Sequence, residues 1–271
     1  MRGLARVVAA ELTRVRRRSV LAAWLILAAV LAAMIATFVF TAAGSEGGIP
    51  QGAPGLSFPT MDQLTGATGP AAAVRSAATI LGVVTLAFWA ITASSDYPLG
   101  LIRLLAQAEP RRVRLLAGKV VALALVTAAA TTVAVAATVV ASPPLAESAG
   151  IDVSAWTSST PDLVEAVGRA WLDTYLALLV WGVVGLAIAV VTRSSTVAIA
   201  GGVGYVLVVE GLLGVAAPDL ADWLPGATLG ALAQGGTAAV GFGTALALGA
   251  AYATAGLVAG AVTVARRDIT D

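Results

Sequence analysis

Apolar residues in this chain are grouped into long, nearly unbroken runs, and polar residues gather in the short segments between them. Six runs have the length of about 20 residues that a helix needs to cross the apolar core of a bilayer. They cover residues 20–40, 76–95, 115–141, 171–192, 196–217 and 238–264. Backbone groups find no water inside lipid, and long runs without alternation indicate helices in place of a barrel. The pattern therefore predicts an all-α membrane protein, one transmembrane domain over residues 1–271 with six transmembrane helices.

The segment before the first run has a different pattern. Apolar residues recur there at helical spacing, and Arg6 and Arg14 lie off that face, with Glu11 between them. This pattern predicts an N-terminal amphipathic helix over residues 1–18 that lies on the membrane surface. The alternative is a plain basic flank of the first span.

Three connecting segments are too polar or too broken to cross a membrane. Residues 41–75 are rich in Gly and Pro, which predicts an irregular loop. A second loop is expected over residues 142–169, ending in a helix start at Thr160-Pro161-Asp162. Residues 218–234 contain two prolines yet remain apolar, so we expect a short re-entrant helical hairpin there; an interfacial loop anchored by Trp223 is the alternative.

Composition supports the membrane assignment and removes several kinds of chemistry. Hydrophobic residues make up 59% of the chain and charged residues 11%, with a mean hydropathy of +0.92. A soluble globule needs a more polar exterior than this composition can supply. The net charge of +1 gives no electrostatic support to a nucleic-acid partner. The chain has no Cys and no His, which excludes thiol nucleophiles, histidine bases and the usual zinc ligands.

The distribution of basic residues predicts the orientation of the spans. Fourteen of the 16 Lys and Arg residues precede the first span, follow the last one, or lie in the second-to-third and fourth-to-fifth connections. The other connections contain only Arg75 and Arg169 and are otherwise acidic. The positive-inside rule then places both termini in the cytoplasm of a multi-pass protein, which we expect in a bacterial inner membrane.

Residues 96–114 form the longest connection on the basic side. Asp96 can cap a helix opened by Pro98, and the apolar residues that follow share one helical face. A basic turn then leads back to the membrane at Gly118-Lys119. We expect a short amphipathic helix parallel to the membrane, which suits contact with a soluble partner.

In this connection the sequence resembles the permease subunits of ABC-2-type transporters. Their first internal loop commonly contains, in order, an acidic residue, Gly, a Leu-rich stretch with Arg, Gln, a Pro-Arg turn and a Gly-Lys pair. This chain offers Asp96, Gly100, Leu101–Leu105, Gln107, Pro110-Arg111 and Gly118-Lys119. It departs from the pattern in having Asp96 where Glu is commoner, in Pro98, and in the later position of the turn proline. Glu11 and the arginines before the first span also fit, and the resemblance covers essentially the whole chain.

The resemblance implies a transport subunit that is driven by another protein. It implies two permease copies, identical or paralogous, on two ABC ATPase subunits, with membrane lipid around them. It assigns the contact with the ATPase to Asp96, Leu99, Gly100, Ile102, Arg103, Leu105, Gln107, Arg111 and Arg112. The chain lacks a phosphate-binding GxxxxGK[ST] loop, because Val113 stands where the first Gly belongs and Val120 follows Gly118-Lys119. We therefore expect no enzyme activity and no cofactor in this chain, with ATP and Mg bound by the partner.

Glu210 is the clearest acidic residue within a predicted span. Charge is expensive there, so this side chain should face protein or water. It could contact a cationic substrate on the transport path, pair with another group, or stay protonated. Small residues in the spans, such as Gly256 and Gly260, allow close helix approach, which we expect within one chain more than between two.

Other functions remain open from the sequence. A proton-coupled secondary transporter would use Glu210 and Asp173 as a relay, although no inverted repeat is visible. An intramembrane enzyme would have only the Asp219/Asp222 pair, which is too few carboxylates for a magnesium-diphosphate site. A membrane immunity or regulatory protein without transport is a further alternative. The favoured expectation is an exporter subunit for a hydrophobic or amphipathic substrate.

Overall fold

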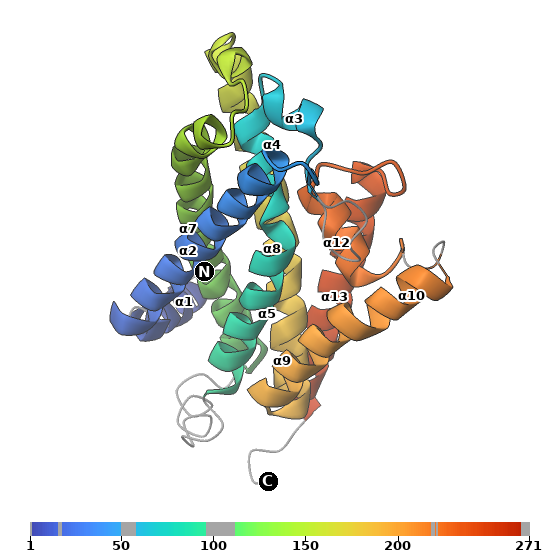
Figure 1. Ribbon diagram of the computed structural model, residues 1–271. Coiled ribbons are helices and arrows are strands. Elements are labelled where there is room, and N and C mark those ends of the chain that lie inside the picture. The colour runs from blue at the N-terminus through green and yellow to red at the C-terminus, as the bar shows by residue number, and fades with distance from the viewer. Residues whose placement is uncertain are drawn as a thin grey trace.

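The computed structural model describes residues 2–15, 18–49, 58–95, 112–217, 220 and 222–266. These residues form helices and turns, with no strand among them. Figure 1 shows the long helices arranged as a bundle in which α5 lies in front of α8. The end at which α5 (Ala78–Ser94) stops and α7 (Arg112–Ser148) begins is called the loop end below. The short helices α3 (Met61–Thr65) and α4 (Gly69–Ser76) lie at the opposite end.

Five helical stretches among the described residues are long and apolar enough to cross a membrane, which indicates a multi-pass membrane protein. They belong to α2 (Arg18–Ala43), α7, α8 (Thr160–Thr192), the stretch Ser195–Ala216 and α13 (Phe242–Arg266). The remaining predicted span, the second one at 76–95, corresponds to α5, which is bent by 41° from α4. Counted as one span, that bent pair would give the six that the sequence predicts.

Helices α7 and α8 are longer than the third and fourth predicted spans, to which they correspond. Helix α7 continues through Pro143 and Pro144 to Ser148, so the expectation that a loop begins at residue 142 was wrong. Proline has a helical φ but no N–H, so Pro143 and Pro144 leave the carbonyls of Val139 and Val140 without their usual helical donors, and α7 continues in spite of that loss. The start signal predicts Thr160 as the capping residue, and α8 begins one residue earlier than that, with Ser159 in the capping position and Thr160 as its first residue.

The loop predicted for residues 41–75 is partly helical. Thr60 opens α3 with a reciprocal capping box, in which its hydroxyl accepts from the Gln63 N–H and the Gln63 side chain accepts from the Thr60 N–H. A proline in the first turn then opens α4. Trp156, in the short 3₁₀ helix η1 (Ser154–Thr157), donates to the carbonyl of Leu64 at 2.8 Å. A local capping box and a hydrogen bond from the distant Trp156 thus stabilise α3, although the Gly- and Pro-rich composition of residues 41–75 predicts an irregular loop.

Glycines opposite tryptophans determine how α5 packs on α8. A Cβ at Gly82 would lie 2.4 Å from Trp181, and a Cβ at Gly182 would lie 2.5 Å from Trp89. The Trp89 ring is fully buried and donates to the Thr127 hydroxyl on α7 at 3.0 Å. Each helix therefore receives a tryptophan of the other in a gap that only glycine leaves.

The last helix also uses glycine to approach its neighbours. A Cβ at Gly256 would lie 3.3 Å from Val183 and Ala187 of α8, and one at Gly260 would lie 3.5 Å from Leu116 of α7. These contacts lie within one chain, and a contact of the same glycines with a second copy stays untested.

The fifth predicted span is one continuous helical stretch with an irregular middle. It consists of α9 (Ser195–Gly204), the π-helical segment η2 (Tyr205–Glu210) and α10 (Gly211–Ala216). In Figure 1, α10 points away from the bundle. Several of its apolar side chains are exposed, including Leu212 and Val215, as expected for a surface that faces lipid.

Part of the predicted hairpin 218–234 is described, and it contains one short helix. Helix α12 (Pro225–Ala233) has nine residues, a length of about 14 Å, and cannot cross a bilayer core. It contacts α8 and α13. Residues 218, 219 and 221, where the first arm of the hairpin is predicted, lie outside the described residues.

Candidate functional site

Most of the predicted ATPase contact lies outside the residues that the structure describes. This holds for Asp96, Leu99, Gly100, Ile102, Arg103, Leu105, Gln107 and Arg111. Arg112 is the first residue of α7, and its side chain is not described. What the structure does describe is the framework at both ends of this loop, and that framework is the candidate site.

The predicted amphipathic helix forms the side of this site. Helix α1 (Arg2–Val15) is present and packs on α7, while Arg6 lies on its exposed face. A Cβ at Gly118 would lie 2.4 Å from Cγ1 of Val7, so glycine allows α1 to approach α7 closely. The apolar face of α1 is therefore turned at least in part toward protein, and a position on the membrane surface stays a prediction.

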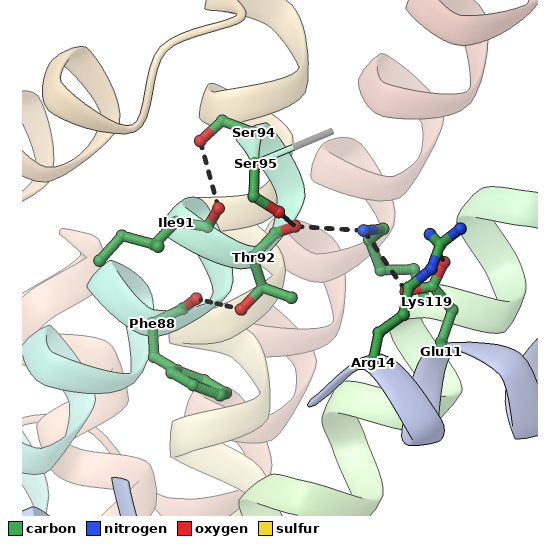
Figure 2. Close-up of polar contacts among 8 residues, drawn as sticks. All are labelled: Glu11, Arg14, Phe88, Ile91, Thr92, Ser94, Ser95 and Lys119. Atoms are coloured by element: carbon green, nitrogen blue, oxygen red, sulfur yellow. Dashed lines mark hydrogen bonds and ion pairs between the residues drawn. The ribbon is translucent and has the colours of Figure 1, made fainter. Parts of the chain in front are cut away.

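Lys119 joins three helices at the loop end. Its ammonium lies 3.5 Å from Oε2 of Glu11 on α1 and donates to the carbonyl of Thr92 on α5 at 3.1 Å. Glu11 is only 4% exposed, and its other oxygen accepts from Arg14 at 3.1 Å. Figure 2 shows Lys119 between the Thr92 carbonyl and the Glu11 carboxylate. Both charges are nearly buried, so their pairing offsets part of the free-energy cost of removing each from water.

Side-chain hydroxyls bind two further carbonyls in the last turns of α5. The hydroxyls of Thr92 and Ser94 donate to the carbonyls of Phe88 and Ile91, and Ser95 donates to the Thr92 carbonyl that also binds Lys119 (Figure 2). A cation near a helix C-terminus is favoured by the helix dipole as well. The point at which the loop leaves α5 is thereby held at a defined place beside α1 and α7.

The structure supplies the reason for the Gly118-Lys119 pair and for Glu11. In the sequence they are a motif fragment and a lone acid on an amphipathic helix. In the fold, Gly118 lets α1 approach α7 closely, and Lys119 binds Glu11 of α1. The signal in the sequence that could have suggested this contact is an acidic residue, Glu11, on the mostly apolar face of the predicted helix.

A second polar contact involves Glu210. It is 5% exposed, and its two carboxylate oxygens accept from the N–H groups of Gly226 at 2.7 Å and Ala227 at 3.2 Å. These are free donors of the first turn of α12, where the helix dipole favours a negative charge. Of the roles considered for Glu210, pairing with protein has a visible partner. Contact with a substrate stays a prediction.

A third contact was not foreseen from the sequence. Arg75, the last basic residue of α4, donates to Oδ2 of Asp173 on α8 at 2.9 Å. Asp173 is 7% exposed, so this ion pair is largely removed from solvent. The only available signal was an acid within an apolar run and an arginine just before another one. The pair stands apart in sequence by 98 residues, which no local pattern reveals.

The described residues contain no cluster of three or more acidic side chains that could hold a metal ion. Comparison with known proteins adds no identification, because no family model matches the chain and no curated protein matches it.

Proposed function

We propose that this chain is the membrane-spanning permease subunit of an ATP-driven ABC-2-type transporter in a bacterial inner membrane. In this proposal six spans cross the membrane with both termini in the cytoplasm, and the loop end is cytoplasmic. Two ABC ATPase subunits bind there and supply ATP and Mg, and a second permease, identical or paralogous, completes the complex. The cargo is a hydrophobic or amphipathic compound that is exported.

One observation carries the proposal. The loop with the ordered ABC-2-like residues connects α5 to α7 in the sequence, and Lys119, seven residues into α7, contacts both Glu11 of α1 and the Thr92 carbonyl near the end of α5. A loop that passes force must be attached to a rigid frame, because a flexible attachment would absorb the movement. Glu11, Thr92 and Lys119 form such a frame from three helices.

The proposed mechanism follows from that attachment. The amphipathic segment Leu99–Gln107 would lie in a groove of the ATPase, with Ile102 and Leu105 as its apolar contacts. Closure of the two ATPases on nucleotide would displace the loop. Because the loop is fixed to α1, α5 and α7, these helices would move together between two packings. Glu210 keeps its place in this proposal as a residue that a cationic part of the cargo could meet.

Substitution of the loop's apolar residues tests the proposal. We expect Ile102→Asp and Leu105→Asp to weaken binding of the proposed ABC ATPase subunit at least about tenfold, since each places a charge in an apolar contact. Stimulation of ATP hydrolysis by the permease should be lost in parallel. Pull-down and ATPase assays in lipid measure both quantities.

Met61→Asp is the matched control. Met61 is 43% exposed and opens α3 at the opposite end of the bundle, so the same new charge lies far from the loop. It should leave binding and ATPase stimulation unchanged. If the two loop variants also behave like the unmodified protein, the coupling role is wrong. Transport that follows a proton gradient and not ATP would favour the secondary-transporter alternative.

A further inference from the structure

Helix α12 is buried, although it is too short to be a span. Thr228, Leu229 and Leu232 are each at most 1% exposed. The helix packs against α8 and α13 and also contacts α5 and η2. It is therefore an internal element of the bundle. Because it is too short to cross a bilayer, the chain before it and the chain after it should lie on the same side of the membrane.

Glu210 holds the first turn of α12. Its oxygens accept from two successive N–H groups, at Gly226 and Ala227. The contact is close, since a Cβ at Gly226 would fall on the Glu210 carboxylate. A charged acceptor on two helix-end donors makes a stronger contact than neutral hydrogen bonds do. We call this contact the first clamp.

A second clamp holds the residues that follow α12. The Gln234 amide donates to the carbonyl of Arg75 at 3.4 Å. Gly235 passes directly over the ion pair of Arg75 and Asp173, because a Cβ there would lie 3.2 Å from the nearest atom of each. The bend between α4 and α5 follows within two residues of Arg75. The second clamp thus joins α4, α8 and the C-terminal end of α12 at one place.

At the second clamp the chain leaves α12 through two successive glycines. Gly235 and Gly236 both have positive φ values, +78° and +103°. Glycine adopts this region without the steric cost that other residues meet, so successive glycines can change φ and ψ easily. Pro225 at the other end makes the first turn of α12 stiff. The nine-residue helix α12 is therefore joined to α13 through residues 234–241, a connection that includes both of these glycines.

We propose that α12 is a movable plug, which the two clamps hold in the closed position inside the bundle. Apolar packing alone would hold a permanent core helix, and buried ionisable groups are expensive in a membrane protein unless they have a use. Polar clamps differ because water that enters during opening can solvate the freed groups. The free-energy cost of opening is therefore smaller than it would be if the same polar groups were left without any hydrogen-bond partner. The inference rests on this geometry and not on the proposed ATPase partner.

Cysteine labelling tests the plug. The chain has no native cysteine, so Ala231→Cys in α12 introduces a single thiol at a side chain that is 3% exposed. Its reaction with a water-soluble maleimide is followed in lipid nanodiscs that contain the permease alone. We expect slow labelling with both clamps intact. Glu210→Gln or Asp173→Asn should each accelerate it about tenfold, as expected when a charged contact that limits local opening is lost.

Two controls separate opening of the plug from general loosening. Ala189→Cys places the thiol in α8 at a fully buried side chain of the main core, and its labelling should stay slow in both clamp variants. Asp173→Glu keeps the charge opposite Arg75 and should restore slow labelling of Ala231→Cys. The proposal is overturned if Ala231→Cys stays slow in both clamp variants, or if Ala189→Cys accelerates equally. Because no ATPase is present, failure here leaves the coupling proposal untouched, and the reverse also holds.

Discussion

Replacing Gly182 with leucine will destabilise the helical bundle more than any other single change considered for this protein. A Cβ at Gly182 would lie 2.5 Å from Cε2 of Trp89, a ring that is fully buried between α5, α7 and α8. Either the ring leaves its site or α5 separates from α8. Overpacking alone costs about 1–3 kcal/mol, and the hydrogen bond from Trp89 to Thr127 adds about 1 kcal/mol when it is lost.

The measurement is thermal unfolding in detergent together with the fraction of protein that elutes as a single species. We expect a large fall in both for Gly182→Leu. Gly168→Leu is a matched control on the same helix, since no atom lies within 4 Å of a Cβ there. Leucine favours helix over glycine by roughly 0.5–1 kcal/mol, so this control should be neutral or slightly stabilising. Equal effects of the two leucines would contradict the Trp–Gly packing.

The second large effect concerns the contact between Glu11 and Lys119. Their side chains are 5% and 12% exposed, so removing one charge takes this ion-pair contact away from a charge that is nearly buried. Such a loss typically costs 3–5 kcal/mol, roughly, and we expect about 3 kcal/mol for Glu11→Gln and for Lys119→Met. We expect the lower end of this range because contacts remain in each variant: Glu11 keeps Arg14, and Lys119 keeps the Thr92 carbonyl. Thermal or denaturant unfolding of each variant provides the numbers.

A double-mutant cycle isolates this contact from the other effects of each substitution. Glu11→Gln combined with Lys119→Met should cost clearly less than both single changes added together, because neither charge is then left alone. The exposed pair of Glu165 and Arg169, whose side chains are 63% and 72% exposed, serves as the comparison. Glu165→Gln should change stability by less than about 0.5 kcal/mol. Strict additivity at Glu11 and Lys119 would show that the two charges do not stabilise each other.

The sequence predicted where helices form better than how they continue. The apolar runs placed the long helices because, in lipid, a run of sufficient length has no alternative to helix. It did not reveal that α7 continues past Pro143, because proline favours a helix end locally and only the packing of the whole helix decides whether it ends there. It also missed the helices after Thr60, whose capping box is a local signal that could have been found.

The candidate site divides in the same way. Gly118-Lys119 and Glu11 stood out as residue patterns, yet their partners lie on other helices. Glu210 was identified as a buried acid because its position within an apolar run is a property of the sequence. That it binds the first turn of α12, and that Arg75 meets Asp173, are results of three-dimensional packing.

By itself, the sequence determined that this is an all-helical protein with several membrane-length helices, since the transfer of a long apolar run into lipid depends on that run alone. The tertiary structure decided which glycine receives which tryptophan and which charge neutralises which. These choices depend on close contact between segments far apart in the chain, and the free energy of such a contact exists only after the helices have packed.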